Sequence, residues 1–245
     1  MEQRLAESKA AQKVLGAAWR ENLRLPDREI GKHADHLVTI AGFVRKHRPR
    51  VVAAPYWADR HPDHAAASVL ITEAVFNAGL RKYTDAEGEA WKAEWICYYF
   101  INDGATPSFV VDVSDCYEKK RKALDCHVTQ FQPPGPQTAA TRLNTPLFRQ
   151  LIESRDAQFG ALAGCPWAEG FVVREPVVRP ALFRTPPPFR QPYPAIVSTL
   201  CFLKRNSMPL ACLATILSLR SCTRLQSSFT FSQEIPCSSG SRTIS

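Results

Sequence analysis

The sequence lacks several features that mark exported, membrane or disulfide-stabilised proteins. Its eight cysteines form no Cys-x-x-Cys pair, and we interpret them as small buried side chains in a reducing compartment. Residues 1–14 are polar and charged, without the apolar region that an export signal requires. The longest apolar stretch, residues 210–219, is shorter than the roughly 20 residues of a membrane helix. We therefore expect a cytoplasmic protein with no membrane partner.

Acidic residues are almost absent from the last quarter of the chain. The formal charge is +8, of which residues 185–245 carry +5, with Glu234 as their one acid. A nucleic-acid footprint clusters on one face or helix, whereas this positive charge is scattered. The remaining residues are nearly balanced, and 45% hydrophobic content is typical of a globular protein. We expect no nucleic-acid partner.

The chain divides into a domain over residues 1–184 and an irregular tail over residues 185–245. The tail contains eleven serines, one glycine and three consecutive prolines. Such a composition is typical of a disordered extension, but its scattered Leu, Ile, Phe and Cys residues are unusual for one. Our hypothesis is that the tail is translated out of frame.

The domain alternates helical and extended patterns. Helices are expected over residues 1–18, 32–47, 63–78, 115–126 and 146–162, and strands over residues 51–54, 95–100 and 109–113. This alternation predicts an α/β domain with a mainly parallel sheet.

One segment gathers chemically useful side chains, namely Asp59-Arg60-His61-Pro62-Asp63-His64. It follows a buried strand, and ligands of open α/β sheets bind beyond the carboxyl ends of strands. His64 can therefore ligate a metal, while His61 can act as an acid or oxyanion donor with Asp63 fixing its tautomer. In the alternative interpretation, Asp63 only caps the next helix and both histidines are surface groups.

We expect several other polar residues to lie at the protein surface. We expect surface positions for the four histidines outside this segment, and a surface pair for two charged residues near the end of the domain. These residues are His33, His36, His47, His127, Glu169 and Arg174.

From about residue 2 to residue 176 the chain resembles the LmbE-like (PIG-L) zinc-dependent N-acetylglucosaminyl deacetylases, and most closely the deacetylases of bacillithiol biosynthesis. The matching segments occur in the family's order. They are Arg20-Glu21-Asn22-Leu23, Leu25-Pro26-Asp27, Ala54-Pro55-Tyr56 with the 59–64 segment, Ala78-Gly79-Leu80-Arg81-Lys82-Tyr83, Pro107-Ser108-Phe109-Val110-Val111-Asp112, Pro136-Gln137-Thr138, Asn144-Thr145-Pro146 and Glu169-Gly170-Phe171.

The resemblance implies a Rossmann-like three-layer sandwich and hydrolysis of the N-acetyl group of N-acetylglucosaminyl malate. It implies that His64 ligates Zn²⁺, that His61 stabilises the oxyanion or protonates the leaving amine, and that Asp63 orients His61. Gln137 and Asn144 would border the sugar pocket. The expected partner is a small amino-sugar conjugate, and a homo-oligomer is left open.

The resemblance also implies a gap. Family members begin with a strand that leads into His-Pro-Asp-Asp, which supplies two zinc ligands and the general base, and this sequence contains no such motif. We therefore expect an N-terminally truncated domain without unaided activity, and a poorly soluble one unless another chain supplies the missing strands. The alternatives are a non-catalytic sugar-binding or interaction fragment, and a normal enzyme whose start and end are misassigned.

Overall fold

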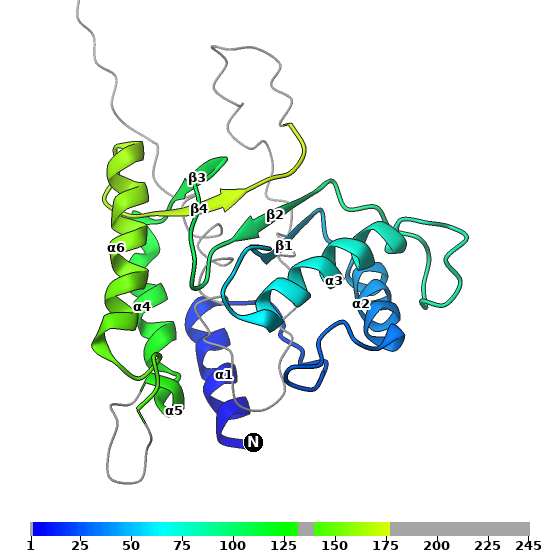
Figure 1. Cartoon of the computed structure of the whole chain (residues 1–245), viewed down its shortest axis with the longest axis horizontal. Coiled ribbons are helices and arrows are strands. Elements are labelled where there is room, and N and C mark those ends of the chain that lie inside the picture. Colours follow the sequence, from blue (N-terminus) through cyan, green and yellow to red (C-terminus); the bar gives the residue numbers. More distant parts are fainter. Residues whose placement is uncertain (1, 132–139, 177–245) are drawn as a thin grey trace, which may run out of the picture.

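The computed structural model describes residues 2–131 and 140–176, shown as a coloured ribbon in Figure 1. The helices are α1 (Glu2–Leu15), α2 (Ala34–His47), α3 (Pro62–Ala78), α4 (Tyr117–Asp125), α5 (Val128–Phe131) and α6 (Pro146–Ala163), with a 3-10 turn, η1, at Ser114–Cys116. The strands are β1 (Val51–Pro55), β2 (Trp95–Tyr99), β3 (Phe109–Asp112) and β4 (Ala168–Val172). All the helices and strands expected within these residues are present, and α5 and β4 are additional.

The four strands form one sheet in the order β1-β2-β4-β3. β1 and β2 are parallel, with Val51 opposite Trp95. β4 lies between β2 and β3 and runs antiparallel to both. The prediction of a mainly parallel sheet is therefore wrong for the described strands, because the unpredicted β4 enters the sheet in the reverse direction.

Helices α2 and α3 pack near β1, as Figure 1 shows. Val52 and Ala54 of β1 are fully buried there, since alternate residues of a strand face the same side. α3 contributes small side chains, including Ala67 and Ala74, which let it lie close to its neighbours. This packing fixes the position of the loop that joins β1 to α3.

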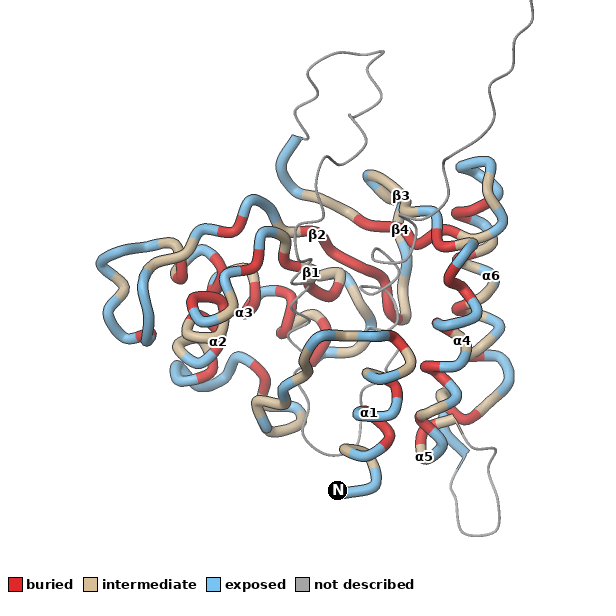
Figure 2. Tube along the Cα trace, turned by 180° about the vertical axis from the view of Figure 1, so that it is seen from behind, coloured by how far each residue is buried: buried red, intermediate tan, exposed pale blue. Residues whose placement is uncertain are grey.

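Helices α4 and α6 lie toward the other end of the sheet, and α6 packs on β4. Two glycines make room here, Gly170 for the packing of α6 on β4 and Gly160 for the segment that follows α6. A Cβ atom on Gly170 would lie 2.5 Å from the Phe159 ring, and one on Gly160 would lie 2.6 Å from the carbonyl oxygen of Cys165. Figure 2 shows buried segments of β2, β4 and α6 lying together.

Some expectations lie outside the described residues, namely Gln137 and the tail over residues 185–245. Within the described residues, no helix has the length and apolarity needed to span a bilayer. The three-layer arrangement and the N-terminal truncation stay predictions.

Candidate active site

The loop between β1 and α3 holds the densest group of candidate residues. His61 is the N-cap of α3 and Pro62 occupies its first turn, a position that suits proline because its missing N–H has no helical partner there. Nδ1 of His61 accepts a hydrogen bond from the backbone N–H of Asp63 at 3.2 Å. The chain therefore turns sharply at the carboxyl end of β1 and places His61 and His64 on the first turn of the helix.

His64 is held by Asp59 from the same loop. Nδ1 of His64 lies 2.8 Å from Oδ1 of Asp59, and both side chains are almost completely buried. Asp59 also accepts hydrogen bonds from the backbone N–H of Asn102 at 2.9 Å and from its side-chain amide at 3.0 Å. Although burial alone would raise the pKa of Asp59, hydrogen bonds from His64, Asn102 and the His61 backbone lower it well below its usual range. The ionised Asp59 keeps the proton of His64 on Nδ1.

The other ring nitrogen of His64 fits a metal ligand. Nε2 is buried and has no hydrogen-bond partner within the described part of the chain. A carboxylate bound to one imidazole nitrogen while the other is left as a lone-pair donor is the usual support of a metal-ligating histidine. Residues 2–131 and 140–176 nevertheless contain no group of three His, Cys, Asp or Glu side chains that could hold a metal. They fit one ligand position and do not form a complete metal site.

His61 lies beside His64, with ring centroids 4.7 Å apart and the rings nearly parallel. Burial and then the neighbouring His64 lower the pKa of His61, while Asp63, Asp27 and Asp59 oppose this shift. Because its Nδ1 accepts the Asp63 N–H, neutral His61 carries its proton on Nε2. His61 can therefore donate a hydrogen bond from Nε2, as expected for an oxyanion or leaving-amine donor.

Asp63 is buried, but its carboxylate is engaged elsewhere. Oδ2 accepts a hydrogen bond from the backbone N–H of Arg28 at 3.0 Å. The hydrogen bond from Asp63 to His61 comes from its backbone N–H. The tautomer of His61 is thus held by the backbone of residue 63, and a catalytic role of the carboxylate stays a prediction.

Asn144 lies in the turn before α6 and is buried. Its Oδ1 accepts a hydrogen bond from the backbone N–H of Thr141 at 2.8 Å, and its own N–H donates to Oγ1 of Thr141 at 3.4 Å. These contacts stabilise the turn locally. A substrate-binding role of Asn144 stays a prediction, as does that of Gln137.

Two residues of the site were missed as partners of His64, namely Asp59 and Asn102. Asp59 lies four residues after the end of β1 and Asn102 three residues after the end of β2, and these two strands are parallel neighbours. The carboxyl ends of parallel neighbours meet at one edge, so polar residues at these positions were the available signal.

Two of the four histidines expected at the surface are buried instead. His36 is 4% exposed and accepts a hydrogen bond from the Gly31 N–H through Nδ1, and His127 is 1% exposed. The expectation of a surface position is wrong for both, because contacts with other elements decide their burial.

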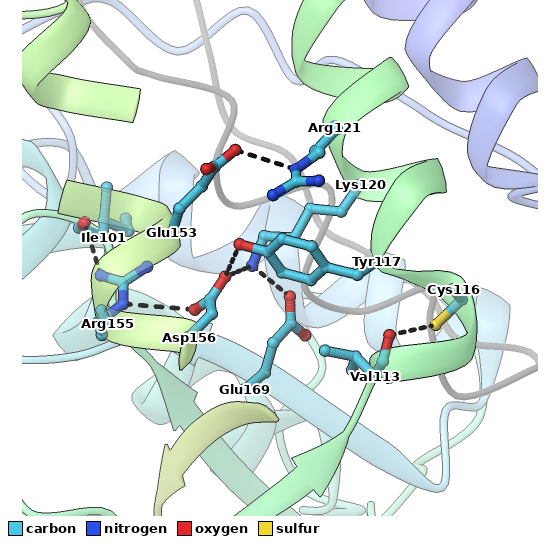
Figure 3. Close-up of polar contacts among 10 residues, drawn as sticks. All are labelled: Ile101, Val113, Cys116, Tyr117, Lys120, Arg121, Glu153, Arg155, Asp156 and Glu169. Carbon is cyan, nitrogen blue, oxygen red and sulfur yellow. Dashed lines mark hydrogen bonds and ion pairs between the residues drawn. The ribbon is translucent and has the colours of Figure 1, made fainter. Parts of the chain in front are cut away.

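A buried ionic cluster, shown in Figure 3, lies where α4, α6 and β4 meet. Nζ of Lys120 donates to Oδ2 of Asp156 and to Oε1 of Glu169, each at 2.6 Å. The Tyr117 hydroxyl also donates to Asp156, at 3.0 Å. The prediction of a surface pair between Glu169 and Arg174 is therefore wrong, since Glu169 is buried and paired with Lys120.

Comparison with known proteins gives related sequences. The family model PIG-L, described as GlcNAc-PI de-N-acetylase, matches residues 1–75. The diacetylchitobiose deacetylase of Thermococcus kodakarensis is 28% identical over 174 residues, which are 68% of this chain and 61% of that protein. The chain thus spans less than two thirds of the length of this curated relative.

Two solved structures share the fold. The conserved protein TT1542 from Thermus thermophilus is 34% identical, with a TM-score of 0.66 over 75% of this chain and 78% of that chain. The N,N'-diacetylchitobiose deacetylase from Pyrococcus horikoshii is 23% identical, with a TM-score of 0.59 over 70% of this chain and 63% of the other. At this lower identity the second likeness concerns the fold alone.

Proposed function

We propose that the chain is a member of the PIG-L family, and that its 59–64 loop derives from the active site of a zinc-dependent deacetylase. The reaction would hydrolyse the acetamide of an N-acetylglucosaminyl conjugate. One observation carries the proposal, namely the buried, unpartnered Nε2 of His64 behind the Asp59–His64 hydrogen bond. A metal ion is one partner that such a buried lone pair can bind, with the carboxylate behind it as support.

Each residue of the loop has a separate task in this proposal. His64 is one zinc ligand, and Asp59 fixes its tautomer and orientation. His61 either donates a hydrogen bond from Nε2–H to the carbonyl oxygen, which becomes negative when water adds, or gives that proton to the amine nitrogen as the bond to the acetyl carbon breaks. The described residues supply no complete metal site, so we derive no step in which the metal acts.

We propose N-acetylglucosaminyl malate, the bacillithiol precursor, as the substrate. The support is the run of segments shared with the bacillithiol deacetylases, from Arg20-Glu21-Asn22-Leu23 to Glu169-Gly170-Phe171. The alternative is diacetylchitobiose, which the name of the relative from Thermococcus kodakarensis indicates. Both are conjugates of N-acetylglucosamine, so the two hypotheses share the bond that is broken. We also propose a cytoplasmic location, because Cys97, Cys116, Cys126 and Cys165 carry thiols and not disulfides.

We propose further that the chain alone does not hydrolyse its substrate. A catalytic zinc needs about three protein ligands and an open position for water, and the described residues bring only His64 to the site. A chain that keeps the loop without a complete metal site could still bind the sugar. A non-catalytic sugar-binding module is therefore the second candidate function.

Acetate release and sugar binding test these proposals together. The full chain with added Zn²⁺ is incubated with N-acetylglucosaminyl malate or diacetylchitobiose, and binding of each is followed by saturation-transfer NMR. We expect no acetate release, and binding that is weakened in His61→Ala but not in His33→Ala, an exposed histidine outside the site.

The outcomes separate the hypotheses. If neither sugar binds, the proposed substrate class is wrong. Binding that is indifferent to Zn²⁺ favours the binding module. Acetate release that disappears in His64→Ala shows that ligands beyond the described residues complete the site, and contradicts our expectation of an inactive chain.

A further inference from the structure

The segment that follows β2, residues 101–104, lies between the candidate active site and the buried ionic cluster. On one side, Asn102 donates to the carboxylate of Asp59 from its backbone N–H and from its side-chain amide. The backbone N–H of Arg60 donates to Oδ2 of Asp103 at 2.6 Å. The segment is therefore joined to the candidate active site by hydrogen bonds from both its backbone and its side chains.

On the other side, the segment is held by Arg155 of α6. Nη1 of Arg155 donates to the carbonyl oxygen of Ile101 at 2.9 Å, and Ile101 is completely buried. A carbonyl group in such a position needs a hydrogen-bond donor. A Cβ atom on Gly104 would lie 3.9 Å from Cδ of Arg155, so the aliphatic part of the arginine also packs against the segment.

Arg155 in turn contacts the ionic cluster, as Figure 3 shows. Its Nε lies 3.7 Å from Oδ1 of Asp156, whose other carboxylate oxygen accepts a hydrogen bond from Lys120 at 2.6 Å. Lys120 also donates to Glu169. Because the side chain of Arg155 is only 12% exposed, solvent screens its ion pair weakly. The guanidinium is thus held by the cluster through one nitrogen and holds Ile101 through another.

One peptide unit connects this arginine to the candidate site. The carbonyl group of Ile101 and the N–H of Asn102 belong to the same planar peptide bond. Its oxygen accepts from Arg155, and its N–H donates to Oδ2 of Asp59 at 2.9 Å. Any rotation of this peptide unit therefore changes both hydrogen bonds. Asp59 also lies 2.8 Å from Nδ1 of His64, so the effect reaches the candidate ligand.

We propose that Arg155 is a positioning residue for the candidate site, which it reaches through the peptide unit between Ile101 and Asn102. The inference rests on the ligand role proposed for His64, because a histidine ligand needs its other ring nitrogen to be held by a partner. Without Arg155 the buried carbonyl group of Ile101 loses its donor, and the peptide unit is free to rotate. Asp59 is then held less firmly, and it supports Nδ1 of His64 less well.

¹⁵N NMR of the His64 ring in the full chain, at one fixed pH and without added metal, measures the ratio of its Nδ1–H to its Nε2–H tautomer. We expect Arg155→Gln to lower this ratio about 2–30-fold, as is typical of residues in a network that couples two positions. Arg121→Gln is the matched control and should leave the ratio unchanged. Arg121 pairs with Glu153 beside the same cluster, and no polar contact joins it to Ile101 in Figure 3.

A second variant serves if Arg155→Gln does not fold. Arg155→Lys keeps a positive charge beside Asp156 but offers a single nitrogen in place of Nε and Nη1, and it should lower the ratio by less. An unchanged ratio in the folded Arg155 variants overturns the proposal, as does an equal fall in Arg121→Gln. Zn²⁺ is added afterwards. If it leaves the His64 resonances unchanged although Arg155→Gln alters the tautomer, the ligand role is wrong and the positioning role holds.

Discussion

The buried Glu169 should make the stability of the protein fall as the pH rises toward neutrality. Its carboxylate shares the ammonium of Lys120 with Asp156, and its Oε2 is buried without a hydrogen-bond partner in the described residues. Burial raises the pKa of Glu169 to about 7, the charge of Lys120 opposes the rise, and that of Asp156 adds to it. Glu169→Gln removes this titration while keeping the shape of the side chain.

The sign and the size follow from linkage. A carboxyl whose pKa is raised on folding is most favourable below its unfolded pKa of 4.5, and that stability is lost as the pH rises through about 7. At 1.36 kcal/mol per pKa unit the loss is ~3 kcal/mol. The unmodified protein should therefore lose about this much stability relative to Glu169→Gln between pH 4.5 and pH 8.

Urea unfolding followed by tryptophan fluorescence at pH 5, 6, 7 and 8 measures the effect. Glu153→Gln is the matched control, because Glu153 lies on the same helix as Asp156 but is partly exposed and paired with Arg121. A constant difference between the unmodified protein and Glu169→Gln across the pH range would refute the assignment of a raised pKa to Glu169.

Two further substitutions test other parts of the structure. Gly170→Ala should lower the free energy of unfolding by about 1–3 kcal/mol, because its Cβ would meet the Phe159 ring at 2.5 Å. Gly104→Ala, whose Cβ would meet only a flexible side chain at 3.9 Å, is the control in the same urea titration. Asp59→Asn should reduce the fraction of His64 that carries its proton on Nδ1, as measured by ¹⁵N NMR of the imidazole ring, because a neutral amide oxygen accepts that proton less strongly than a carboxylate. An unchanged tautomer would show that Asp59 does not hold the Nδ1 proton of His64.

Much of the fold could be predicted from local patterns. The apolar run of β1 between two prolines and the alanine-rich α3 are clear in the sequence, because backbone periodicity determines them. β4 was missed because Glu169 and Gly170 stand inside it, and both residue types are uncommon in strands. Glu169 is tolerated there since Lys120, 49 residues away in sequence, lies 2.6 Å from it. No local pattern contains that information.

In the candidate site, too, local sequence patterns predict where a residue lies but not which distant residues contact it. The position of His64 after a buried strand led to the prediction of a ligand. The structure confirms its place in the first turn of α3, and its role as a ligand stays a prediction. The partners of His64 depend on which strands become neighbours, so the contribution of Asn102 from the end of β2 could not be read from the loop itself. The burial of His127 likewise depends on the packing of α1, α4 and α5.

The most direct test of the account is whether Nε2 of His64 binds a metal. ¹⁵N NMR of the histidine rings during a Zn²⁺ titration resolves each nitrogen. The account predicts that Zn²⁺ shifts Nε2 of His64, that its Nδ1 stays protonated and bound to Asp59, and that His64→Ala abolishes this binding while His33→Ala does not. Zinc binding that leaves the His64 resonances unchanged, or that survives in His64→Ala, would contradict it.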